Sequence, residues 1–228
     1  MPPKAKTNRE MIVNAAFEIA KEIGLKYFLE LDDDYVSLQI RYLDDGKLRG
    51  KNPPSLDALF ESMLQFLDDT GALTVAFSQG GDYIGGANGK YFYQGLSRKA
   101  MNTFFCRTDR PIGFFGTINE DVNAYTTLGS RGELFLSLTT AAITQKATQS
   151  NAGGMTGVYL DSGTYVKSFY SVMSMPSCVS VKVMGSSHAR MHHHVNWVNC
   201  VPMIINQKYK KGIVDSNNIY NNTVPRNE

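Results

Sequence analysis

Alternating helix and strand patterns over the first eighty residues constrain the fold of this chain most strongly. Thr7 and Glu10 have the spacing of a capping box, and the apolar residues after them recur at helical intervals. Gly24 follows where a helix-ending glycine is expected, and "KYFLEL" then predicts a short buried strand. The apolar stripe of this first helix consists of Ile12, Ala16, Ile19, Ala20 and Ile23.

The same order occurs a second time. Ser55 is expected to cap a helix that runs through Thr70, Gly71 closes it, and "ALTVAFS" predicts the next strand. The stripe of this helix is Leu56, Leu59, Phe60, Met63, Leu64 and Leu67. Helix-strand-helix-strand order with glycine at the junctions is typical of a mostly parallel α/β sheet flanked by helices.

The remainder of the chain is less regular. Asn119 is a plausible cap for a short helix, and the tail is rich in Asn and Lys. We expect one domain with a flexible tail. The further predicted elements and boundaries are strands over 133–139, 141–148 and "SCVSVKVM", a helix from about Tyr159 to Met173, the domain over 1–207 and the tail over 208–228.

Composition narrows the class of protein. The 228 residues are 43% hydrophobic, which suffices for a substantial core, and a formal net charge of +2 means that any nucleic-acid surface must come from local clustering. Three widely separated cysteines, Cys106, Cys178 and Cys200, favour reduced thiols over a disulfide framework. No long apolar run or signal-peptide pattern occurs, so we expect a soluble, cytoplasmic protein without a membrane partner.

Three consecutive aspartates, Asp32, Asp33 and Asp34, end the first predicted strand. Neighbouring like charges disfavour one another, and a divalent cation would relieve this repulsion, whereas a solvated turn is the simpler alternative. Ligands gather at the carboxyl ends of strands in parallel α/β sheets. Because the second strand also ends in a polar, glycine-rich segment, "QGGDYIGG", we favour a binding site at this edge.

Two further groups of residues could carry chemistry. All four histidines lie at positions 188, 192, 193 and 194, where metal ligation, phosphate contact and a surface cluster are all open. An Asp-x-Asp at a strand end favours one histidine as an additional metal ligand. Glu120 and Asp121 open the predicted short helix, either as favourable charges at its N-terminus or as a general base. The glycines of "QGGDYIGG" match neither a GxGxxG nor a Walker phosphate loop.

Many ordered motifs between about residues 8 and 205 resemble the TET-associated glycosyltransferases, which are encoded by bacteriophages and related elements. The motifs are "NAAFEIAKEIGLKYFLELDDDY", "FSQGGDYIGG", "KAMNTFFC", "INEDVNAYTTLGSRGELF", "QSNAGGMT", "LDSGTYVKSFYSVM", "PSCV" and "HHHVNWVNCVP". The resemblance implies a GT-A-like enzyme that transfers a sugar from a nucleotide donor, here a UDP-sugar, to hydroxymethylated pyrimidines in DNA.

The resemblance also implies site residues. Asp32 and Asp34 would be the DxD pair that binds Mn²⁺ or Mg²⁺ and the donor diphosphate, with His192 or His193 as the late contact. Asp121 would activate the acceptor, with Glu120 as its substitute. The remaining implied residues are Asp33, Gly80, Gly81, Asp82 and Arg131 for the donor, and Gly153 and Gly154 for the acceptor.

One departure from the GT-A pattern is expected. The first helix begins within about ten residues of Met1, so the predicted fold lacks the strand-helix unit that normally opens such domains. Two alternatives to the transferase therefore stay open: a metal-dependent nuclease or phosphodiesterase, and a DNA-binding remnant without activity. The sequence predicts no oligomeric state.

Overall fold

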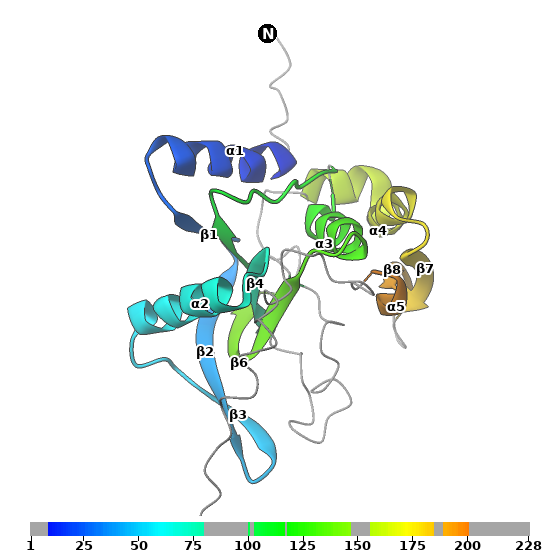
Figure 1. The fold of residues 1–228 in the computed structure, drawn as a ribbon. Helices are drawn as coiled ribbons and strands as arrows, with labels where there is room; N and C mark the ends of the chain where they lie inside the picture. Colours follow the sequence, from blue (N-terminus) through cyan, green and yellow to red (C-terminus); the bar gives the residue numbers. More distant parts are fainter. Residues whose placement is uncertain are drawn as a thin grey trace, which may run out of the picture.

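A computed structural model describes residues 9–79, 100, 103–116, 118–146, 156–184 and 189–200 (Figure 1). Among them, six strands form one sheet in the order β1-β5-β4-β6-β2-β3, and two more form a separate hairpin. The strands are β1 (Tyr27–Leu31), β2 (Tyr35–Asp44), β3 (Lys47–Lys51), β4 (Thr74–Gln79), β5 (Thr103–Arg107), β6 (Phe135–Gln145), β7 (Val179–Met184) and β8 (Arg190–Val195). The helices are α1 (Arg9–Glu22), α2 (Leu56–Thr70), α3 (Glu120–Ser130), α4 (Thr156–Ser174) and α5 (Trp197–Cys200).

One face of the sheet packs against α2. Side chains alternate across a strand, so Val75 and Phe77 of β4 point to this face together with Phe105 of β5. They meet Met63 and Leu67 of α2, which are 1% and 0% exposed. The predicted cap is present, since the Ser55 side chain accepts a hydrogen bond from the Ala58 amide, and Gly71 ends the helix in the left-handed conformation.

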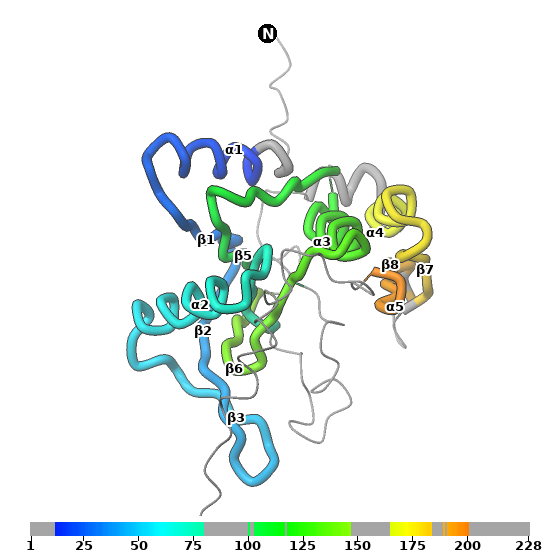
Figure 2. The backbone as a smooth tube through the Cα atoms, viewed as in Figure 1, coloured from blue at the N-terminus to red at the C-terminus, as the bar shows by residue number. Residues whose placement is uncertain are grey.

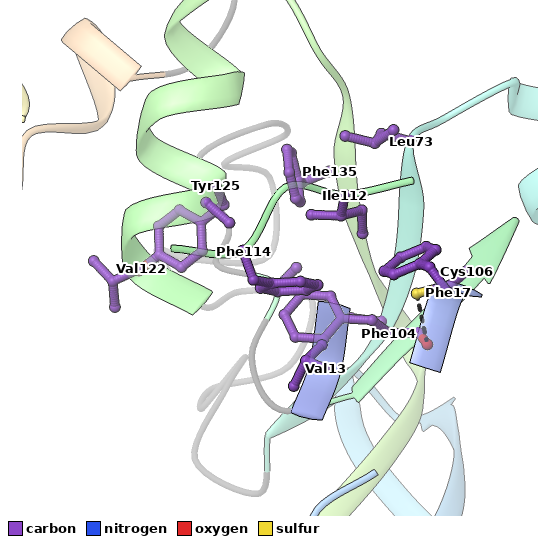
Figure 3. Close-up of a cluster of buried hydrophobic side chains, with 13 residues drawn as sticks. Val13, Phe17, Leu73, Phe104, Cys106, Ile112, Phe114, Val122, Tyr125 and Phe135 are labelled. Atoms are coloured by element: carbon purple, nitrogen blue, oxygen red, sulfur yellow. Dashed lines mark hydrogen bonds between the residues drawn. The ribbon is translucent and has the colours of Figure 1, made fainter. Parts of the chain in front are cut away.

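The opposite face packs against α1 and α3. Ala76 of β4 and Phe104 and Cys106 of β5 lie between α1 and α3 in a second buried cluster. Figure 3 shows the labelled side chains of this cluster, with the Phe104 and Phe114 rings at its centre, 5.1 Å apart and edge to face. The sheet is therefore covered on both sides, as in other α/β folds.

The β7–β8 hairpin packs on α4 and α5 rather than joining the main sheet (Figure 1). Cys178, Val179 and Cys200 form its small buried cluster. The Trp197 ring stacks on the Tyr125 ring at 5.7 Å and 16°, which ties α5 to α3. The two-stranded sheet is thus separate from the main sheet and lies on the side of the molecule that carries α3.

The α/β class is confirmed, but the prediction of a mostly parallel sheet is wrong. Among the described strands, β4 and β6 form the one parallel pair, and every other neighbouring pair is antiparallel. Two features cause this: β5 inserts between β1 and β4, and β2 and β3 form a hairpin that the sequence reading missed. Asp45 and Gly46 have φ of 49° and 70°, as a type I′ turn requires, and Asp-Gly is the signal that identifies such a turn.

Two other expectations need correction. The two strands expected over 133–139 and 141–148 are, within the described residues, the single strand β6, Phe135–Gln145. Its pairing with β4 shifts register where the break was expected. In α1 the predicted Ala20 is buried, together with Val13 and Phe17, whereas the predicted Ile12, Ile19 and Ile23 are 57%, 56% and 66% exposed. Both stripes have helical spacing. The stripe that contains Phe17 is the buried one, because β1 lies against that face of the helix. The Phe17 ring packs edge-on against the Phe28 ring of β1, with the ring centroids 4.8 Å apart.

Candidate functional site

The first and second predicted strands end at the same edge of the sheet. β1 is antiparallel to β5 and β5 is antiparallel to β4, so β1 and β4 run in the same direction with β5 between them. β6 runs parallel to β4 and ends at this edge as well. The edge thus collects Asp32, Asp33 and Asp34 after β1, Gln79 at the end of β4 and Gln145 at the end of β6.

The three aspartates form the turn from β1 to β2, and this turn spans the edge. β1 and β2 hold the first and fifth positions in the sheet, which flat geometry would separate by about 19 Å. Leu31 and Tyr35 are four residues apart and reach at most about 15 Å. The sheet must therefore curve or twist to bring the end of β1 and the start of β2 together.

Asp34 is fixed in this turn by β6. Both of its carboxylate oxygens accept a hydrogen bond from Gln145 Nε2 at 2.9 Å, and its backbone carbonyl accepts from the Lys146 amide at 3.0 Å. Asp32 and Asp34 are half-buried, whereas Asp33 is exposed. Each oxygen of Asp34 keeps a second lone-pair direction for another donor or a cation.

Arg41 of β2 brings a positive charge to the same edge. Its guanidinium donates to Ser78 Oγ at 3.3 Å and to the Gln79 carbonyl at 3.2 Å, at the end of β4. Ser78 Oγ in turn donates to the Ala141 carbonyl at 2.9 Å. Sequence reasoning missed Arg41; an arginine at a polar position of the alternating "YVSLQIRYL" is the signal that could have found it.

The acidic pair of α3 lies at a different junction. Glu120 and Asp121 are 7% and 8% exposed in the first turn of the helix, and Asp121 Oδ1 accepts a hydrogen bond from the Val122 amide at 2.7 Å. Asn119 occupies the cap position as predicted, but in the left-handed conformation and without a side-chain capping bond. Its amide instead donates to the Lys167 carbonyl at 2.8 Å and to Ser171 Oγ at 3.0 Å, which joins α3 to α4.

Two histidines reach this junction from β8. His193 Nδ1 lies 3.3 Å from Asn119 Nδ2, and the His192 and His193 rings are 4.3 Å apart. The strand expected before the histidines, "SCVSVKVM", is β7, and residues 192 to 194 lie in the next strand, β8, which pairs with it. The structure therefore places His193 beside the residue that precedes Glu120 and Asp121.

The predicted metal ligands are not assembled as one set. Among the described residues, no three His, Cys, Asp or Glu side chains are grouped so that they could hold an ion. Two carboxylates nevertheless fit the needs of Mg²⁺ or Mn²⁺, because such ions commonly take one or two protein carboxylates and complete their shell with substrate phosphates and water. Asp32 and Asp34 fit that share of the ligands, and their metal role stays a prediction.

Of the remaining predicted site residues, the structure describes Arg131 but not the glycines or Asp82. Arg131 is the exposed C-cap of α3, so it lies at the opposite end of an eleven-residue helix from Glu120 and Asp121. Gly80, Gly81 and Asp82, the acceptor glycines Gly153 and Gly154, and the tail over 208–228 lie outside the described residues.

The cysteines are free and buried, in accord with the expected thiols. Burial raises the pKa of the Cys106 thiol and raises that of Cys200 to about 12, so both stay protonated near neutral pH. Burial, with a contribution from the Asp121 carboxylate, also raises the pKa of Tyr125 well above 10. Among the described helices, none has the length and apolar character needed to span a membrane.

Comparison with known proteins identifies a family for this chain. The model of the family described as TET-Associated Glycosyltransferase matches residues 5–154, from the segment that leads into α1 to beyond β6. The match includes the acidic turn, Arg41 and the acidic pair of α3, whereas the histidines of β8 lie beyond it. Searches of curated proteins and of solved structures each found no match. The chain belongs to the TET-associated glycosyltransferase family.

Proposed function

We propose that this protein transfers a sugar from a nucleotide-sugar donor, a UDP-sugar, to hydroxymethylated pyrimidines in DNA, with Mn²⁺ or Mg²⁺. The observation that carries the proposal is the family match over residues 5–154. That range contains the carboxyl edge of the sheet, where an acidic turn and a guanidinium gather. A GT-A relationship and a cytoplasmic location, which would be the host cytoplasm for a phage-encoded protein, remain expectations from the sequence.

The carboxyl edge has the chemistry that a sugar diphosphate requires. Asp32 and Asp34 would hold the metal ion, which neutralises the charge on the departing diphosphate. Gln145 orients the Asp34 carboxylate through the two 2.9 Å contacts. Arg41 lies at the end of β4, where its guanidinium has the geometry to bind phosphate oxygens.

The acceptor step needs a base. In the proposed reaction the hydroxymethyl oxygen bonds to the anomeric carbon of the sugar while the bond from that carbon to the diphosphate breaks. The nucleoside diphosphate leaves with the bonding electrons, and the hydroxyl proton moves to the Asp121 carboxylate, or to Glu120 as its substitute. Both carboxylates are largely shielded from water. The histidines of β8 are proposed as secondary contacts, since His193 lies beside Asn119.

Label transfer from radiolabelled UDP-glucose to duplex DNA that contains 5-hydroxymethylcytosine tests the proposal. The reaction is run with Mn²⁺ or Mg²⁺, with a chelator, and with unmodified DNA. We expect label on the modified DNA alone, lost on chelation. Other nucleotide sugars are tested in parallel, because the sugar is not specified. No transfer from any donor would contradict the proposal, and metal-dependent cleavage of the DNA backbone would identify a nuclease instead.

Asp32→Asn is the sharpest variant for the metal site. It keeps the size of the side chain and removes the charge, and we expect transfer to fall at least about 100-fold, a loss of about 2.7 kcal/mol of transition-state stabilisation. Asp57→Asn is the matched control, because Asp57 is exposed in the first turn of α2 and belongs neither to the acidic turn nor to the β2–β3 hairpin. Equal activity of the two variants would refute the role of Asp32.

A further inference from the structure

The β2–β3 hairpin carries a basic row on one face. Lys47, Arg49 and Lys51 alternate along β3, and residues two apart point to the same side of a strand. Their partners in register on β2 are Asp44, Tyr42 and Ile40. The row is about 13 Å long at about 3.3 Å per residue, comparable with the roughly 12 Å width of the DNA major groove.

This face is open to solvent. β3 is the last strand of the sheet, so its outer edge has no neighbour among the described strands. Figures 1 and 2 show the hairpin extending beyond α2, away from the body of the molecule. Lys47, Arg49 and Lys51 are exposed, and Tyr42 is 46% exposed between them.

The contacts within the row leave its charge available. The Lys51 ammonium lies 5.4 Å from the centre of the Tyr42 ring, which supports the lysine stem without neutralising it. Arg49 pairs with Asp44 at 3.4 Å, and both side chains are more than half exposed, so water and salt weaken this pair. By contrast, Arg107 is held by Asp68 and Asp109, and Arg110 by Glu133 and the end of α2.

We propose that the basic face of the β2–β3 hairpin docks the protein on the phosphate backbone of duplex DNA. The inference rests on the proposed function for the choice of DNA as the polyanion. The exposed basic side chains of β3 identify the surface that binds it. A two-stranded ribbon is one of the elements that fit the major groove. Because phosphate contacts fix position without reading bases, the hairpin binds modified and unmodified duplexes alike.

The salt dependence of binding gives the magnitude. Each phosphate contact contributes a slope of about −0.9 to log K against log salt, so the three side chains supply about −2.7. Raising salt from 50 to 200 mM then weakens binding through these contacts about 40-fold. Lysines on an edge strand also discourage strand pairing between molecules, but that role predicts no salt-dependent affinity for DNA.

The test compares two double variants of equal charge by fluorescence anisotropy on a labelled duplex, without donor or metal. Lys47→Gln with Lys51→Gln removes two charges from the hairpin, and Lys21→Gln with Lys182→Gln removes two exposed charges elsewhere. We expect the hairpin variant to lose about 1.8 of the slope, so that a fourfold rise in salt costs it about 12-fold less affinity than it costs the parent. The control keeps the parental slope.

Asp44→Asn provides an independent readout of opposite sign. It removes the carboxylate beside Arg49, so binding should tighten, and a thermal melt checks that each variant is folded. Equal losses in the two double variants, an unchanged affinity in Asp44→Asn, or no DNA binding by the parent protein would overturn the inference. If the hairpin variants bind like the parent while sugar transfer occurs, the docking surface is wrong and the proposed function stands. If DNA binding depends on the hairpin but no donor supports sugar transfer, the docking surface stands and the proposed function is wrong.

Discussion

Replacing Asn119 tests how the acidic turn of α3 is held in place. The Asn119 side chain is 5% exposed, its φ is 56°, and its amide donates to the Lys167 carbonyl and to Ser171 Oγ. Asn119→Ala removes two hydrogen bonds worth about 1 kcal/mol each, and it places alanine in a left-handed conformation at a further cost of about 1 kcal/mol. We expect a loss of about 3 kcal/mol in the free energy of unfolding.

Asn119→Gly separates these two contributions. Glycine loses the same hydrogen bonds but adopts the left-handed conformation without strain, so it should cost about 2 kcal/mol. Glycine would then be more stable than alanine by about 1 kcal/mol at this position, the reverse of their order in a helix interior. Asn52→Ala, at an exposed asparagine, is the control and should change stability by less than about 0.5 kcal/mol.

Urea unfolding followed by the emission of Trp197, the single tryptophan, measures all three variants. The probe is well placed because its ring stacks on Tyr125 of α3. A loss below about 1 kcal/mol in Asn119→Ala would refute the role of the two hydrogen bonds. An alanine variant more stable than the glycine variant would refute the contribution of the backbone conformation.

Two further predictions concern α3. Gly129→Ala should destabilise the protein by about 1 kcal/mol or more, although alanine favours helices, because a Cβ there would overlap the carbonyl oxygen of Cys200. Gly113→Ala is the control and should not destabilise the protein, because a Cβ there meets nothing. A thermal melting temperature of Gly129→Ala above that of the parent protein would contradict the prediction. Tyr125 has a raised pKa in the folded state, so only the unfolded chain releases its phenolic proton above pH 10, and stability should fall there by up to about 1.4 kcal/mol per pH unit from this group. Denaturant unfolding between pH 9 and 11 measures the effect, and Tyr125→Phe should flatten the pH dependence of stability. An identical pH dependence in that variant would show that Tyr125 ionises equally in the folded and unfolded states.

Local sequence signals determined the elements whose ends are marked by specific residues. Ser55 and Gly71 bound α2 as predicted, because a side-chain cap and a left-handed glycine are properties of a few neighbouring residues. The Asp45-Gly46 turn is equally local, and it would have identified the β2–β3 hairpin had its signal been used. The family resemblance was likewise a property of ordered motifs and is confirmed over residues 5–154.

The candidate site could be predicted in part. The position of Asp32 to Asp34 after a strand, and their place at one edge with the end of β4, follow from the order of elements. The support of Asp34 by Gln145 did not, since 111 residues separate the two in the chain. Arg41 of β2 comes within reach of Ser78 and Gln79 of β4 because both strands pair with β6, a contact that no local pattern predicts.

Tertiary structure alone decided which faces and partners the elements take. Both stripes of α1 have the period of a helix, and contact with Phe28 of β1 selects the one that contains Phe17. Strand direction is also invisible to local pattern, so the insertion of β5 between β1 and β4 made an expected parallel sheet mostly antiparallel. The sequence by itself determined what each segment would form, because periodicity and capping act over a few residues. Only the folded chain decided which segments meet, because pairing and burial depend on surfaces far apart in sequence.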